Sequence, residues 1–253
     1  TTGPIPHGRR MFEISFDFIG HELHILVDDG QTQVFKLRPQ SVAKFYREIM
    51  SALAELGLEV KIAAAPNELP DATPFAEDEE HAQYDPVAAR RFWQVLSQSG
   101  RVFTEFRSLF CGKCSPVHFF WGSFDLAVTR FSGRSAPPHP GGIPHLPDAV
   151  TREAYSQEVS SLGFWPGNDQ IPEALFYSYA YPSPQNFAQS TVAPTAAYFH
   201  GQLKEWVLPY DAVRQAASPE AEILAFAQTT YDAAASLAGW DREALAEKKP
   251  ALR

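Results

Sequence analysis

Hydrophobic and polar residues alternate near the start of the chain. Apolar side chains occupy every second position of residues 12–18, which is the pattern of a strand with one buried face. Residues 23–27 repeat the pattern, residues 35–37 continue it, and the dipeptide Asp29-Gly30 between these segments is typical of a hairpin turn. The pattern therefore predicts three strands in an antiparallel arrangement.

The spacing of apolar residues changes to three and four between residues 42 and 56. Side chains at these intervals lie on one face of a helix, and Gly57 stands where a left-handed residue often ends a helix. Residues 60–64 are a short apolar run that predicts a buried strand. Together these elements favour an α+β fold, mainly antiparallel sheet with helices packed on one face.

The middle of the chain alternates between loop and helix signals. Residues 66–84 are acidic and contain proline, which is typical of a solvated loop. Asp85-Pro86 then predicts the start of a long helix, with Asp as N-cap and Pro at the first helical position. Gly100 interrupts the apolar stripe and would divide this helix in two. Residues 135–147 contain five Pro and two Gly and are predicted to be a loop.

The second half has weaker periodicity. Residues 150–161 predict a short helix closed by Gly163, and the tyrosines of residues 177–181 alternate as in a strand. Residues 196–208 predict a hairpin, and Ser218-Pro219 predicts the start of a final helix.

Length and cysteine content favour one core without covalent supports. We expect a single α+β domain over residues 1–253, because no repeat or low-complexity linker divides the chain. The only cysteines, Cys111 and Cys114, are too few for a disulfide framework. They also supply only half of the four ligands that a structural zinc ion needs. Cysteine chemistry is therefore disfavoured.

The charge balance excludes several classes of partner. The formal net charge is −9, and no run of Lys or Arg exceeds two residues, so nucleic acid and anionic membrane surfaces are not expected partners. No segment has the roughly 18 consecutive apolar residues of a spanning helix, and no secretory signal begins the chain. We predict a cytoplasmic protein whose partner is a small-molecule ligand, and the oligomeric state stays open.

The run from Ser115 to Arg134 combines charged residues with a strand-like, aromatic sequence. His118, Asp125 and Arg130 all have aromatic or aliphatic neighbours on both sides. A buried unpaired charge costs several kcal/mol, so Asp125 and Arg130 must face water or find partners. This run is therefore the predicted functional site.

The dipeptide Gly122-Ser123 decides which of these side chains share a face. In an uninterrupted strand His118 and Arg130 lie on one face and Asp125 on the other. A bulge would bring His118 and Asp125 to the same face, as an imidazole oriented by a carboxylate. A turn would instead make a hairpin with Phe120 opposite Asp125. A core histidine with a separate surface salt bridge is the purely structural alternative.

Three functions agree with these residues. The first is an enzyme for a small apolar or aromatic substrate, with His118 as base or metal ligand and Asp125 orienting it. Arg130 or Arg134 would hold a substrate carboxylate. The predicted substrate-binding residues are Phe120, Trp121, Arg130, Arg134, Glu153, Tyr155 and Trp165. The second function is a non-catalytic ligand-binding or sensing module, and the third is an interaction or assembly protein.

Common cofactor motifs are missing from the chain. The sequence has no glycine-rich phosphate loop, no His-Glu-x-x-His and no Gly-x-Ser-x-Gly. The cofactor is therefore unknown, and no metal ligand set is predicted.

Several segments resemble a bacterial domain-of-unknown-function family, number 5996. The most specific is the run Ser-Pro-Val-His-Phe-Phe-Trp-Gly-Ser-Phe-Asp from Ser115 to Asp125. The resemblance implies an additional N-terminal segment, rich in Trp and His, ahead of Thr1. It implies no activity. The other matching segments are Pro4-Ile5-Pro6, Phe12-Glu13-Ile14, residues 38–42, residues 81–85, residues 152–156, residues 163–167 and residues 208–211.

Overall fold

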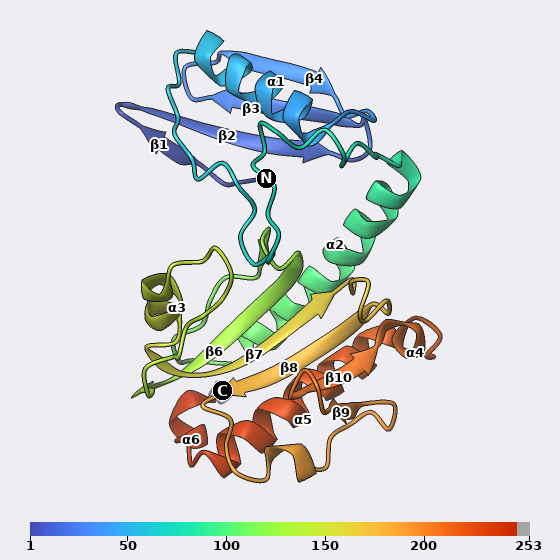
Figure 1. Ribbon diagram of the computed structural model, residues 1–253. Helices are drawn as coiled ribbons and strands as arrows, with labels where there is room; N and C mark the ends of the chain where they lie inside the picture. The colour runs from blue at the N-terminus through green and yellow to red at the C-terminus, as the bar shows by residue number, and fades with distance from the viewer. Residues whose placement is uncertain (247–253) are drawn as a thin grey trace, which may run out of the picture. The chain divides into compact units, whose positions relative to one another are not determined.

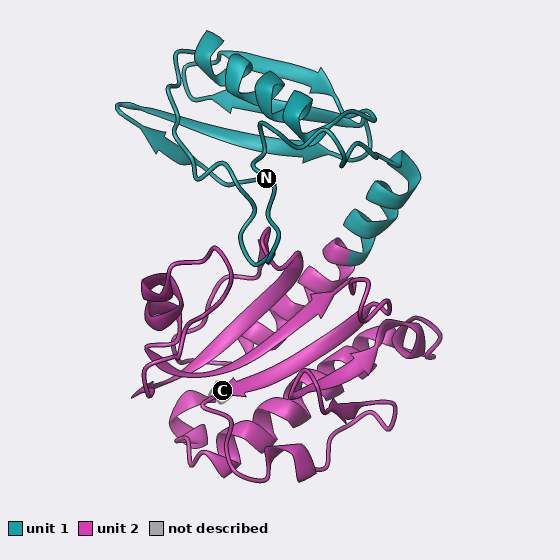
Figure 2. Ribbon diagram, viewed as in Figure 1, with its two compact units in different colours: residues 1–95 teal, residues 96–253 magenta. Residues whose placement is uncertain are grey.

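The structure is a computed structural model that describes residues 1–246. The chain divides into two compact units, residues 1–95 and residues 96–253 (Figure 2). Each unit has its own antiparallel sheet and helices, so the predicted α+β class is confirmed, with two sheets in place of one. That residues 1–253 act as one domain stays a prediction.

The first unit is a four-stranded sheet in the order β1-β2-β3-β4, with helix α1 packed on one face (Figure 1). The alternating residues predicted as strands form it, and Phe12, Leu23 and Ile25 are buried against Leu53 and Leu56 of the helical segment. The elements are β1 Ile5–His7, β2 Arg10–Asp17, β3 Glu22–Val27, β4 Thr32–Lys36 and α1 Val42–Glu55.

Both ends of α1 are capped by residues of the expected types. The hydroxyl of Ser41 accepts a hydrogen bond from the Lys44 amide at 3.2 Å. Gly57 takes the left-handed conformation at φ +69°, and the next amide, of Leu58, donates to the carbonyl of Leu53 at 2.8 Å. The helix therefore ends where the sequence predicted.

The strand predicted at residues 60–64 is wrong. This segment forms no helix or strand, because the sheet ends at β1 and β4 and neither edge strand pairs with it. Ile62 is 51% exposed, so the apolar run is not a buried strand.

Helix α2, Pro86–Ser108, begins in the first unit and continues into the second. The Asp85 carboxylate accepts from the amides of Val87 and Ala88, as expected of an N-cap. The expected break at Gly100 is wrong, since the helix is continuous there. Among residues 1–246 no helix, α2 included, is long and apolar enough to cross a lipid bilayer.

The second unit is a six-stranded antiparallel sheet in the order β5-β6-β7-β8-β10-β9. Its strands are β5 His118–Phe120, β6 Asp125–Ser135, β7 Gln157–Trp165, β8 Leu175–Tyr181, β9 Tyr198–His200 and β10 Glu205–Pro209. Helix α2 and helix α5, Pro219–Leu237, cover the same face (Figure 1). The buried Phe103 of α2 lies edge-on to Phe176 of β8, with 6.2 Å between ring centroids. The shorter helices are α3 Asp148–Ala154, α4 Tyr210–Arg214, α6 Arg242–Leu245 and the 3-10 helix η1 Phe187–Gln189.

The helix predicted at residues 150–161 is largely wrong. Helix α3 ends at Ala154, and residues 157–165 form β7, a central strand of the sheet. All six residues from Val159 to Phe164 are buried. A strand covered on both faces has no strict alternation of polar and apolar residues, so its pattern resembled a helix. The strand, hairpin and helix predicted over residues 177–237 are confirmed.

Candidate functional site

The run from Ser115 to Arg134 contains a β-hairpin. Strand β5 pairs with β6 so that Phe120 lies opposite Asp125 and His118 opposite Ala127. The turn alternative for Gly122-Ser123 is therefore confirmed and the bulge alternative is wrong. Because residues that lie opposite in an antiparallel pair share a face, the hairpin places His118 and Asp125 on the same face.

A row of paired residues extends this face across all six strands. The row contains His118, Ala127, Gly163, Tyr177, Val207 and Tyr198. Every second residue along each strand points the same way. We call the resulting surface the polar face; its polar and aromatic members are His118, Phe120, Asp125, Thr129, Phe131, Gln157, Ser161, Trp165, Tyr177, Tyr179, Tyr181, Tyr198, His200 and Glu205. None of these strand positions holds Lys or Arg.

Arg130 lies on the opposite face of β6, because five positions separate it from Asp125. It is 1% exposed, and its guanidinium carbon lies 3.5 Å from the ring centroid of Phe106 and 4.4 Å from that of Tyr231. Arg130 therefore does not share a surface with His118 and Asp125.

Asp125 is almost completely buried, at 6% exposure. The hydroxyl of Ser123 donates to its Oδ1 atom at 2.7 Å, and the hydroxyl of Tyr177 donates to Oδ2. Within residues 1–246 no Lys, Arg or His forms an ion pair with Asp125. The carboxylate is thus held by two hydroxyl groups and not by a cation.

Gly163 makes the hydrogen bond between Tyr177 and Asp125 sterically possible. The Tyr177 ring lies directly over this glycine, and a Cβ atom at position 163 would be 2.2 Å from Cζ and 2.3 Å from the hydroxyl oxygen. Gly163 was predicted to close a helix, and the structure instead places it under an aromatic ring in the centre of the sheet.

Replacing Gly163 with Ala is expected to displace Tyr177 and break its hydrogen bond to Asp125. Overpacking of this kind costs about 1–3 kcal/mol of unfolding free energy, which urea denaturation would measure. The matched control is Gly201→Ala, since a Cβ there meets nothing within 4 Å, and its expected effect is within about 0.5 kcal/mol. Equal stabilities of the two variants would contradict this account.

Tyrosines continue the polar face beyond Asp125. The rings of Tyr177 and Tyr179 are stacked with 6.1 Å between centroids. The Tyr179 hydroxyl lies 2.7 Å from the hydroxyl of Tyr155. The ring of His139 stacks on the ring of Tyr155, with 4.8 Å between the ring centroids. Burial, with nearby acidic groups, raises the pKa values of Tyr177 and Tyr179 well above 10. These phenols therefore stay protonated and act as hydrogen-bond donors.

Glu205 is the acidic group at the other side of the polar face. It begins β10, two positions before Val207, and no hydrogen bond or ion pair joins its carboxyl group to another of residues 1–246. Burial, and secondly the charge of Asp125, raises the pKa of Glu205 to about 7. The group therefore exists in both protonation states at neutral pH.

His118 shares the polar face but does not bind Asp125 directly. No hydrogen bond links it to another described residue, and its ring lies 4.2 Å from that of Phe120. Partial desolvation of the otherwise exposed His118 ring lowers its pKa, and the nearby Asp125 carboxylate opposes this shift only in part. The imidazole is therefore mainly neutral at pH 7.

The other predicted site residues are dispersed. Phe120 and Trp121 are exposed on the hairpin, Trp165 ends β7 on the polar face, and Glu153 is exposed on α3. Arg134 forms an ion pair with Glu158 at 2.7 Å and donates to the carbonyl groups of Ala238 and Gly239 that follow α5. A cation at the end of a helix is a structural arrangement, so Arg134 is already bound within the fold.

Sequence reasoning did not select Tyr177, Tyr179 or Glu205 as site residues. The alternation of the tyrosines predicts a strand, and three phenols on one face of that strand also indicate a polar surface. Glu205 directly precedes the apolar run Trp206-Val207-Leu208, and a charge beside such a run was a second available signal.

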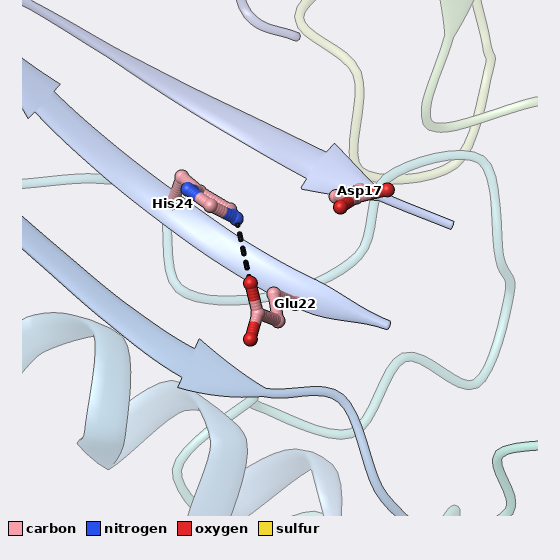
Figure 3. A group of neighbouring side chains, drawn as sticks. All are labelled: Asp17, Glu22 and His24. Carbon is pink, nitrogen blue, oxygen red and sulfur yellow. Dashed lines mark ion pairs between the residues drawn. The ribbon is translucent and has the colours of Figure 1, made fainter. Parts of the chain in front are cut away.

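A separate acidic group in the first unit has the geometry of metal ligands. One ligand atom each from Asp17, Glu22 and His24 lies within 4.8 Å of the others (Figure 3). The Asp17 carboxylate already accepts two backbone amides, and Lys36 lies 2.7 Å from Glu22. His24 Nε2 is 3.2 Å from Glu22 Oε2 without hydrogen-bond geometry. The carboxylates are therefore balanced by groups of the protein itself.

The first unit also contains an open pocket of about 600 Å³. Phe16, Phe18 and Phe45 contribute apolar walls, and residues 80–84 form one side. Four of its polar side chains already bind other residues. Arg38 and Gln40 both donate to Glu48, His81 is paired with Asp78 and the Tyr84 hydroxyl binds His21.

Comparison with known proteins adds a family but no described activity. No curated protein and no solved structure matches the chain. The model of a family of unknown function, DUF5996, matches residues 1–247, nearly the whole sequence, in agreement with the resemblance of the Ser115–Asp125 run and the other segments. The chain therefore belongs to the DUF5996 family.

Proposed function

We propose that the polar face is a small-molecule site in which Glu205 exchanges a proton with the bound molecule. The observation that supports this most is the position of the Glu205 carboxyl group, without a hydrogen-bond partner among residues 1–246, on an aromatic surface that also holds Asp125 and His118. Burial there raises the pKa of Glu205 to about 7. A general acid or base is most effective when its pKa lies near the working pH. Glu205 satisfies this condition near neutrality.

The neighbouring residues have separate roles in this proposal. Burial is the main cause of the raised pKa of Glu205, and the charge of Asp125, which the Tyr177 hydroxyl holds in place, adds to it. His118, exposed and mainly neutral, is a second proton acceptor on the same face. The rings of Tyr177 and Tyr179 supply an apolar surface for the substrate.

Deuterium exchange tests the catalytic proposal. The protein is incubated in D2O with a desalted small-metabolite extract, and mass spectrometry records compounds that are consumed or gain deuterium. We expect the wild-type protein and the exposed control Glu243→Gln to transform at least one compound, and Glu205→Gln to transform none. Carbon-13 NMR of labelled glutamate should show Glu205 titrating near pH 7. Titration near pH 4.5 would contradict the proposed role.

A non-catalytic ligand-binding or sensing module is the second candidate. It is favoured by the hydrogen bonds that Asp125, Tyr155, Tyr177 and Tyr179 already form with protein groups, and by the missing hydrogen bond between His118 and Asp125. This candidate predicts compounds that bind the wild-type protein without consumption or labelling. The same experiment therefore distinguishes the two functions.

A further inference from the structure

No Lys or Arg among residues 1–246 forms an ion pair with the two acidic groups of the polar face. Asp125 is bound only by hydroxyl groups, and Glu205 has no partner among residues 1–246. Arg130 lies on the opposite face, and Arg134 is paired with Glu158. Among the described strand residues of the face, only His118 and His200 can become positive. The ammonium of Lys113, from the loop before β5, lies 4.4 Å from the ring centroid of Phe131.

Aromatic rings surround these carboxyl groups. Tyr177 and Tyr179 stack in the centre of the face, and Phe120 lies directly opposite Asp125. The ring faces of tyrosine and phenylalanine attract organic cations.

We infer that the molecule bound at the polar face is an organic cation, a protonated amine with an apolar or aromatic body. This inference rests on the proposed function of the same face and names its substrate class. Asp125 and Glu205 attract the ammonium group, and the tyrosine rings contact the remainder of the molecule. A carboxylate or phosphate ligand is disfavoured, because it would meet two acidic groups that no Lys or Arg of residues 1–246 pairs with.

Three aromatic probes that differ in charge test this inference. Benzylamine, benzyl alcohol and benzoate share one ring, and benzylamine is protonated at pH 8. Calorimetric titration at pH 8 should show saturable binding of benzylamine, and binding weaker by about tenfold or more for the other two probes. Chemical shifts of Tyr177 and Tyr179 should move during the benzylamine titration.

Two variants test whether the acidic groups bind benzylamine. Glu205→Gln and Asp125→Asn should each weaken benzylamine binding by about tenfold, while Glu243→Gln, which removes an exposed charge from α6, should leave it unchanged. Circular dichroism of each variant confirms that it is folded. Equal binding of benzyl alcohol, tighter binding of benzoate, no saturable binding of benzylamine, or full affinity in both variants would overturn the inference.

The inference and the proposed function fail in different measurements. Titration of Glu205 near pH 4.5 contradicts the proton-exchange role. Titration near pH 7 without a preference for benzylamine contradicts only the charge of the ligand.

Discussion

Replacing Glu205 with Gln is expected to stabilise the protein at pH 8 by up to about 3 kcal/mol, and to change its stability little near pH 4. The folded-state pKa of Glu205 is about 7, compared with 4.5 for an unperturbed glutamate. Each pKa unit corresponds to about 1.4 kcal/mol. Between pH 4.5 and 7 the native state binds more protons than the unfolded state, so the unfolding free energy falls as the pH rises. Glutamine removes this loss because it is never charged.

Urea denaturation of the wild-type and variant proteins from pH 4 to pH 8 measures this effect. The control Glu243→Gln removes an exposed carboxylate and should give a difference that does not follow the same profile. Asp125→Asn should lower the Glu205 pKa only in part, because burial is the larger cause of the shift and the Asp125 charge the smaller one. A pH-independent difference between Glu205→Gln and wild type would show that Glu205 is not held in its protonated form.

A residue that lowers the stability of the fold but has a pKa suited to proton transfer is typical of functional sites. A half-buried carboxyl group without a partner among residues 1–246 gives the fold no advantage that glutamine would not give. Asp125 differs, because hydroxyl donors compensate its burial. Glu205 is therefore the residue whose presence most requires a functional explanation.

Local patterns in the sequence predicted the first unit well. Its strands have one buried face, so apolar residues alternate, and Gly57 ends α1 through a local hydrogen-bond pattern. The strand predicted at residues 60–64 is wrong because a strand also requires a partner strand, and a local sequence pattern carries no information about that partner. The helix predicted where β7 lies is wrong for a different reason. This strand is buried on both faces, so its polar and apolar residues do not alternate.

The sequence located only part of the candidate site. The Ser115–Arg134 run and its hairpin alternative were predictable because the turn lies within the run. The partnership of Asp125 with Tyr177 spans 52 residues and depends on the register of three strands. Gly163, which makes room for the Tyr177 ring, gave no recognisable signal. The register between strands distant in the sequence therefore brings Asp125 and Glu205 to the same face, and a local sequence pattern could not predict this.

Replacing Arg130 separates packing from charge on the opposite face of the sheet. Arg130→Ala is expected to lower the unfolding free energy by about 3–5 kcal/mol, the cost of emptying a large buried site. Arg130→Met keeps most of the volume, and we expect its stability to equal or exceed that of the wild type. The positive charge of Arg130 destabilises the fold, because burial lowers the pKa of its guanidinium to about 10. Among residues 1–246 no carboxylate forms an ion pair with Arg130, and its Nε atom is buried without a hydrogen-bond partner.

Denaturation at pH 7 measures the difference between the two Arg130 variants. Cation–π contacts with Phe106 and Tyr231 are each worth about 0.5–2 kcal/mol, and methionine replaces part of this by contact of its sulfur with the rings. If Arg130→Met were as unstable as Arg130→Ala, the guanidinium and its hydrogen bond to the Phe106 carbonyl would be essential to the core. Because Arg130 faces away from Glu205, Arg130→Met should also retain benzylamine binding. Loss of benzylamine binding in a stable Arg130→Met protein would show that Arg130 contributes to the binding site.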